Sequence, residues 1–100
     1  LGVYSMSKAA LNMLTKVFAQ EWGPKGVRVN GIAPGLVKTH FSQALWGNEA
    51  ILQAALNSIP LGRMAEPEEM VGLAIFLASD ASRYMTGQVI LIDGGREISA

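Results

Sequence analysis

Cysteine is absent from this sequence of 100 residues, and histidine occurs only once, as His40. Without cysteine the chain can form no disulfide, no thiolate nucleophile and no thiolate metal site. A single histidine also excludes a metal site built from several histidine ligands of this chain. We therefore expect no metal centre within it.

Long apolar runs and an excess of one charge are also missing. The longest unbroken apolar run towards the end of the chain, Leu73–Ala78, is far too short to span a bilayer. Acidic and basic side chains are interspersed and balance to a formal charge of zero, so no basic stripe suggests a nucleic acid or an anionic membrane as partner. Because 50% of the residues are nevertheless apolar, the chain is not of the disordered class. We expect a folded protein in the cytoplasm.

The segment Tyr4–Trp22 is predicted to form one helix. Apolar residues recur there at spacings of three and four, which is the period of a helix face. These residues are Leu11, Leu14, Phe18 and Trp22. Neighbouring apolar residues widen the band, so more than one side of this helix needs covering. The following Gly23–Gly26, with its glycines and a proline, should end the helix.

Two segments are predicted strands. Val27–Ala33 is rich in β-branched residues, and Gln88–Asp93 is a nearly continuous apolar run, typical of a strand buried on both faces. Between them, Glu66–Glu69 should start a helix that runs to about Ser79, because proline suits the first helical position and acidic residues favour the positive end of the dipole. A single turn should follow at Asp80–Tyr84. A helix between two strands predicts an α/β fold with a parallel sheet.

The loop Pro34–His40 would leave the carboxyl end of the first strand, where open α/β sheets bind ligands. Two short helices are expected after it, between residues 41 and 58, split at residues 47–48. Their apolar side chains have two interpretations. They pack against the core, or the segment at about 40–60 is a lid over a carbonyl substrate. Under the second interpretation, Phe41, Leu45 and Trp46 favour an apolar substrate.

Tyr4 and Lys8 are four residues apart at the start of the first predicted helix. Positions four apart lie one turn apart on the same helix face. A nearby cation favours phenolate and so lowers the pKa of a tyrosine from its usual value near ~10. Such a tyrosine can exchange a proton with a substrate oxygen near neutral pH. The pair also arises by chance, so alone it is a weak signal.

Four blocks in order closely resemble the carboxyl-terminal part of the short-chain dehydrogenase/reductase family, of the type of the 3-oxoacyl-carrier-protein reductases. The blocks are Tyr4–Leu11, Arg28–Gly35, Pro60–Met64 with Glu66–Glu69, and Thr86–Gln88 with Asp93–Gly95. The resemblance covers nearly the whole chain. It implies that residues 1–100 are the carboxyl-terminal portion of a single Rossmann-type domain, a doubly wound parallel sheet.

The resemblance implies a reaction and residues that perform it. The protein would transfer a hydride between NAD or NADP and a small carbonyl or alcohol compound. Tyr4 would donate or accept the proton at the substrate oxygen, beside the cofactor. Lys8 would lower the pKa of that tyrosine and hold the ribose hydroxyls of the cofactor. A homotetramer or homodimer is implied as well.

The same resemblance places the nicotinamide end of the cofactor on the predicted loop. Pro34, Gly35 and Val37 would cradle it, with the Val37 backbone meeting the carboxamide. The Thr39 hydroxyl would contact the carboxamide or the pyrophosphate, although it could equally cap a helix that begins near residue 41. Asn30 we interpret as structural, because such an amide usually satisfies backbone groups.

Several parts of the family pattern are missing from this sequence. It contains no glycine-rich phosphate loop of the form G-x-x-x-G-x-G, no cofactor-selecting residue, and neither the catalytic serine nor the asparagine of the proton relay. The choice between NAD and NADP therefore cannot be predicted. Because the first residue is Leu1 and the sequence starts almost inside a helix, we expect a piece of a longer protein that is inactive alone.

Three other classes of protein are alternatives to this interpretation. A hydrolase would need a nucleophilic serine near His40, and no G-x-S-x-G motif is present. A helix-turn-helix within residues 62–77 would lack a basic recognition helix. A catalytically inactive, family-like subunit that acts as a scaffold or binds a partner is the main alternative. The presence of both Tyr4 and Lys8 counts against it.

Overall fold

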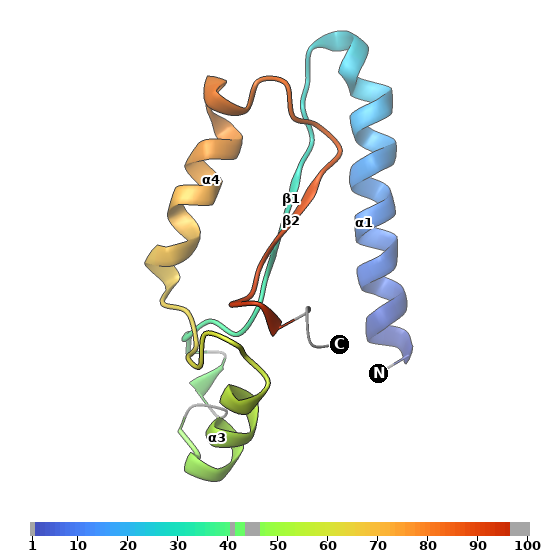
Figure 1. Cartoon of the computed structure of the whole chain (residues 1–100). Helices are drawn as coiled ribbons and strands as arrows, with labels where there is room; N and C mark the ends of the chain where they lie inside the picture. The colour runs from blue at the N-terminus through green and yellow to red at the C-terminus, as the bar shows by residue number, and fades with distance from the viewer. Residues whose placement is uncertain (1, 41, 44–46, 97–100) are drawn as a thin grey trace. The chain divides into compact units, whose positions relative to one another are not determined.

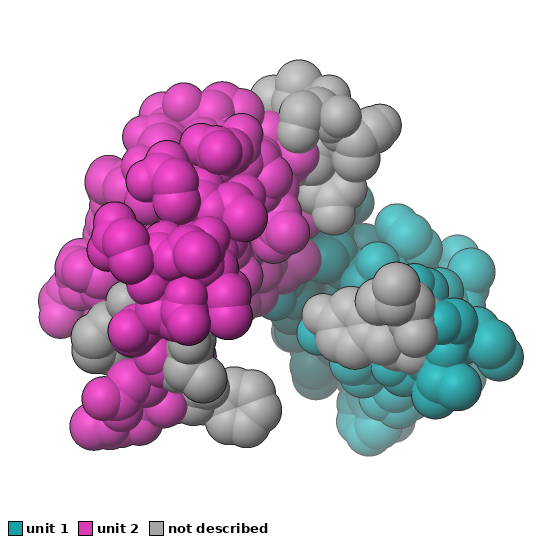
Figure 2. Space-filling model, turned by 90° about the horizontal axis from the view of Figure 1, so that it is seen from below, with its two compact units in different colours: residues 1–32, 74–90 teal, residues 33–73, 91–100 magenta. Residues whose placement is uncertain are grey.

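A computed structural model describes residues 2–40, 42–43 and 47–96. Its main elements are α1 (Gly2–Trp22), β1 (Gly31–Pro34), α3 (Glu49–Asn57), α4 (Val71–Ala78) and β2 (Val89–Ile92), as drawn in Figure 1. Short 3₁₀ helices occupy Gly23–Lys25, Pro67–Met70 and Asp80–Ser82. The residues form two compact units, which Figure 2 colours separately: residues 1–32 with 74–90, and residues 33–73 with 91–100.

The predicted first helix is confirmed as α1, which begins two residues earlier than expected and ends at Trp22. The 3₁₀ turn Gly23–Lys25 follows directly, and the amide of Gly26 donates to the carbonyl of Gly23 at 2.9 Å. Gly26 has a φ of 78°, a left-handed conformation that glycine adopts without steric cost. The glycine- and proline-rich segment therefore ends the helix as predicted.

The two predicted strands pair with each other, in a parallel arrangement. The Gly31 amide donates to the Gln88 carbonyl at 2.8 Å, and the Gly35 amide donates to the Ile92 carbonyl at 3.0 Å. The partners advance together along both strands, which is the parallel pattern. An α/β fold with a parallel sheet is thereby confirmed.

The predicted bounds of the first strand were wrong, because β1 begins at Gly31 and not at residue 27. In front of it, side chains supply hydrogen bonds beside the backbone bond from the Gly87 amide to the Val29 carbonyl at 2.7 Å. The Val29 amide donates to Thr86 Oγ1 at 3.0 Å, and the Gln88 amide donates to Asn30 Oδ1 at 3.1 Å. Asn30 Nδ2 also donates to the Met85 carbonyl at 3.1 Å, so the structural role predicted for this amide is confirmed.

The start of the second long helix follows its predicted chemistry. Pro67 opens a 3₁₀ turn, and the Glu66 amide donates to the Glu69 carboxylate at 2.9 Å. The regular α-helix begins only at Val71 and ends at Ala78, close to the expected end at residue 79. The single turn expected after it is the 3₁₀ helix Asp80–Ser82.

The segment predicted as two short helices is described only in part. Its second helix is confirmed as α3, and Asn48 caps it by accepting from the Ile51 amide at 3.1 Å. Phe41, Leu45 and Trp46, on which the lid interpretation rests, lie outside the described residues. The lid therefore stays a prediction.

Few apolar side chains are covered within the described part of the chain. Only Ala19, Ile59 and Met64 are buried hydrophobic residues there. In β2, predicted to be buried on both faces, Leu91 is 50% exposed, so that expectation does not hold within this chain. No helix among the described residues is long and apolar enough to cross a membrane.

Candidate functional site

Tyr4 and Lys8 both lie in the first turns of α1. Because α1 is continuous from Gly2 onward, their spacing of four residues places them one turn apart on one face, as the sequence predicted. Lys8 is exposed, whereas the Tyr4 side chain is outside the described part of the structure. The backbone thus confirms the one-turn spacing of the two residues.

Four of the six predicted cofactor-binding residues lie within one short segment of the second unit, from the end of β1 onward. Pro34 is the last residue of the strand, and Gly35 continues the pairing with Ile92. A Cβ on Gly35 would stand only 2.8 Å from the Cα of Asp93, closer than real side chains approach. Glycine at this position is therefore required by the close approach of two backbones, and not by a ligand alone.

Val37 is held by a second short piece of parallel pairing, opposite Ala65. The Ala65 amide donates to the Leu36 carbonyl, and the Lys38 amide donates to the Ala65 carbonyl, both at 2.9 Å. Backbone groups of successive residues in an extended segment point to opposite edges. The amide and carbonyl of Val37 therefore point away from Ala65, where a ligand could reach the amide.

Thr39 makes the local contact of a capping residue. Its Oγ1 accepts from the Ser42 amide at 3.1 Å, which is the alternative role that the sequence left open. In return, Ser42 Oγ accepts from the Thr39 amide at 2.9 Å. Ser42 was not among the predicted site residues. Its spacing of three from a threonine is a capping signal that could have found it.

Charged side chains form contacts around residues 63–66, the segment that pairs with the loop through Ala65. Arg63 donates to both carboxylate oxygens of Glu69, at 2.7 and 2.8 Å, and Lys38 forms an ion pair with Glu66 at 3.6 Å. The hydrogen bonds from Arg63 and from the Glu66 amide lower the pKa of Glu69 to about 2. These contacts steady residues 63–66, and Ala65 among them pairs with the loop.

The structure thus groups the predicted residues in two sets. Pro34, Gly35, Val37 and Thr39 share one loop, and Tyr4 and Lys8 share one helix. The two sets belong to different units. Among the described residues, no group of three or more acidic or histidine side chains could hold a metal ion.

Known proteins resemble this chain along nearly its whole length. The family model described as "Enoyl-(Acyl carrier protein) reductase" matches residues 1–97. Dehydrogenase/reductase SDR family member 4 of Rattus norvegicus is 44% identical over 95 residues, which cover 95% of this chain and 34% of that protein. The chain therefore spans about a third of the length of that curated relative.

Solved structures agree in fold. A protein described as a 2-deoxy-D-gluconate 3-dehydrogenase, from Agrobacterium tumefaciens and with bound NADP, is 40% identical, with a TM-score of 0.90 over 95% of this chain and 39% of its own. A 4-hydroxyisoleucine dehydrogenase complexed with NADH is 34% identical, with a TM-score of 0.92 over 97% of this chain and 40% of its own. The predicted Rossmann-type α/β fold is confirmed. The chain belongs to the short-chain dehydrogenase/reductase family.

Proposed function

We propose that the protein containing this chain is an oxidoreductase that transfers a hydride between NAD or NADP and a small carbonyl or alcohol substrate. The observation that carries the proposal is the placement of Tyr4 and Lys8 one turn apart on α1, in a chain of this family. The NADP and NADH bound to two solved relatives support the cofactor. A substrate like that of the 3-oxoacyl-carrier-protein reductases stays a proposal that rests on the four sequence blocks, because the family model's description names an enoyl-(acyl carrier protein) reductase instead.

The proposed chemistry divides between the cofactor and two side chains. When bound, the nicotinamide supplies or accepts the hydride. The Tyr4 hydroxyl gives a proton to the substrate oxygen during reduction and takes it back during oxidation. The Lys8 ammonium favours the phenolate form of Tyr4 and donates hydrogen bonds to the ribose hydroxyls.

The loop at residues 34–39 fits a carboxamide by the chemistry of its groups. A carboxamide both accepts and donates hydrogen bonds. The Val37 amide, directed away from Ala65, is a donor, and the Thr39 hydroxyl can donate or accept. Pro34 and Gly35 bring the loop off the strand end, where open α/β sheets hold their ligands. We propose this loop as the binding place of the nicotinamide carboxamide.

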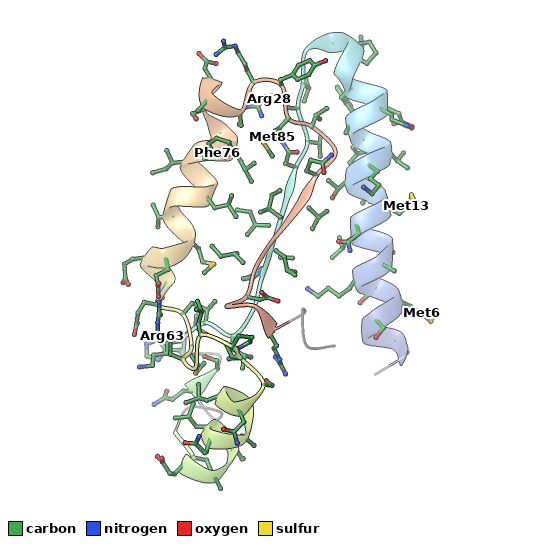
Figure 3. The ribbon with its side chains drawn as sticks, in the orientation of Figure 1. Met6, Met13, Arg28, Arg63, Phe76 and Met85 are labelled. Carbon is green, nitrogen blue, oxygen red and sulfur yellow. The ribbon has the colours of Figure 1, made fainter. Side chains whose placement is uncertain are left out.

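The proposal extends to the whole protein. Residues 1–100 would form the carboxyl-terminal portion of a single Rossmann-type domain in a cytoplasmic homotetramer or homodimer. Wide apolar surface on α1 supports self-association, which light scattering of the intact protein would check. In Figure 3, Met6 and Met13 project outward from α1, and they are 72% and 60% exposed.

Two substitutions in the intact protein separate the proposed roles. Tyr4→Phe should reduce turnover by on the order of 10²-fold and leave NADH or NADPH binding nearly unchanged, because only proton transfer is lost. Lys8→Met should weaken turnover and cofactor binding together, because it removes the charge and the ribose contact. Steady-state rates and titrations of nicotinamide fluorescence would measure both.

Three opposite outcomes would each contradict a different part of the proposal. Near-normal turnover by Tyr4→Phe would remove the acid–base role. A loss confined to turnover in Lys8→Met would mean that Lys8 does not touch the cofactor. An intact protein that binds neither NADH nor NADPH would favour the inactive scaffold subunit instead.

A further inference from the structure

The carbonyl of Val37 accepts a hydrogen bond on the edge of the loop that faces away from Ala65. Ser42 Oγ donates to this carbonyl at 2.7 Å, and the contact is partly buried. Since Val37 directs its amide to the same edge, the hydrogen bond from Ser42 lies beside the group proposed to meet the carboxamide. The orientation of that peptide segment is thus controlled from both edges, by Ala65 and by Ser42.

The Ser42 hydroxyl makes a second contact within the same short segment. It accepts from the Thr39 amide at 2.9 Å while its own proton goes to Val37. A hydroxyl has one proton to donate and two lone pairs, so it can satisfy both groups at once. The side chain therefore ties Val37 to Thr39, the two residues with carboxamide-binding groups in the proposed loop.

We propose that Ser42 is a positioning residue for the nicotinamide ring, which rests on the proposed function of this chain. Its hydroxyl holds the Val37–Thr39 backbone in the shape that receives the carboxamide. Ser42 acts through the loop and touches neither the substrate nor the reacting atoms. Without the hydroxyl, cofactor binding has to order the loop, which costs free energy. The protein therefore binds the nicotinamide end of the cofactor more weakly.

The test compares two ligands that differ only in the nicotinamide half. The intact protein would be titrated with NADH or NADPH, whichever binds, and with ADP-ribose or its 2′-phosphate, which lack the nicotinamide. Ser42→Ala should weaken the nicotinamide cofactor about tenfold, as expected when one or two hydrogen bonds are lost, and leave the ADP-ribose compound within about twofold. Ser42→Thr keeps the hydroxyl and should restore binding, whereas Ser42→Val, of nearly the same shape, should not.

Ser58→Ala is a matched control in the same unit. Ser58 Oγ also donates to a backbone carbonyl, that of Ala55, at 2.7 Å in a partly buried contact, but it lies at the end of α3. This variant should leave the ratio of the two affinities unchanged.

Equal affinities of Ser42→Ala and the unaltered protein for both ligands would overturn the proposal. An equal loss for both ligands, or equal binding by Ser42→Thr and Ser42→Val, would do the same. If Ser42→Ala does not fold, the Thr and Val pair decides the question. An unaltered protein that binds neither ligand contradicts the proposed function itself.

Discussion

At the scale of single residues, Glu69 shows how local hydrogen bonds lower the pKa of a carboxyl group. Its carboxylate accepts two hydrogen bonds from Arg63 and one from the Glu66 amide, and its pKa falls from 4.5 to about 2. A lowered pKa means that the folded state binds the proton more weakly than the unfolded chain does. The resulting stability is present above about pH 4.5 and is lost as the pH falls towards 2. Because the pair is exposed, salt weakens the effect.

The origin of this shift can be tested by removing its main cause. In the intact protein, Arg63→Met should raise the pKa of Glu69 most of the way to its ordinary range, because the strongest hydrogen bonds to the carboxylate disappear. The measurement is an NMR titration of the side-chain carboxyl carbon. Arg83→Met is the control, since the Arg83 side chain donates to the Asp80 carbonyl at 3.3 Å and should leave Glu69 unchanged. A pKa that stays near 2 without Arg63 would contradict the assignment.

At the scale of elements, Arg28 joins the segment before β1 to the end of α4. Its guanidinium donates to the carbonyls of Leu77 and Ser79 at 3.0 and 3.2 Å. It also donates to the carbonyls of Ser82 and Met85 at 2.9 and 3.2 Å, and Figure 3 labels Arg28 beside Met85. Carbonyls at a helix end lack partners within the helix. Arg28 therefore satisfies several of these groups with one planar side chain.

Replacement of Arg28 by lysine should show how much these hydrogen bonds stabilise the protein. Lysine keeps the positive charge but offers a compact ammonium in place of the guanidinium fork, so it cannot reach all the carbonyls. Arg28→Lys should lower the free energy of unfolding of the intact protein by about 2–4 kcal/mol. Urea unfolding would measure it, with Arg83→Lys expected to stay within about 0.5 kcal/mol. Equal stability of the two variants would show that the network contributes little.

At the scale of the whole molecule, exposed apolar surface is the dominant feature. Along α1, the exposed large hydrophobic side chains are Val3, Met6, Leu11, Met13, Leu14, Val17, Phe18 and Trp22. Leaving apolar surface in water forgoes about 25 cal/mol for each Å². A small domain has a margin of only about 5–15 kcal/mol, so these residues need a cover that the described chain does not supply.

We therefore predict that residues 1–100, produced alone, are poorly folded or aggregated and show no nicotinamide-dependent activity. Circular dichroism during heating and light scattering would test the folding, and an NADH or NADPH titration would test the binding. The intact protein is the control and should melt cooperatively. A cooperative melt of a soluble monomer of this chain, or saturable cofactor binding by it, would contradict the prediction.

The features that could be predicted from the amino-acid sequence alone are local. The spacing of Tyr4 and Lys8, the helix stop before Gly26, and the helix start at Pro67 all depend on residues within one or two turns. Backbone propensity and capping act over that range, so a pattern of residue types predicts them. The family resemblance added the roles of the residues, because function is not encoded in periodicity.

Features that depend on residues far apart in the sequence became visible only in the folded chain. β1 starts late because Thr86 and Gln88 bond to the segment in front of it, and Gly35 must be glycine because Asp93 approaches it. Arg28 likewise bonds to carbonyls about 50 residues further along the chain. No local pattern predicts such pairs, since the chain path that brings them together is set by the packing of the sheet and helices.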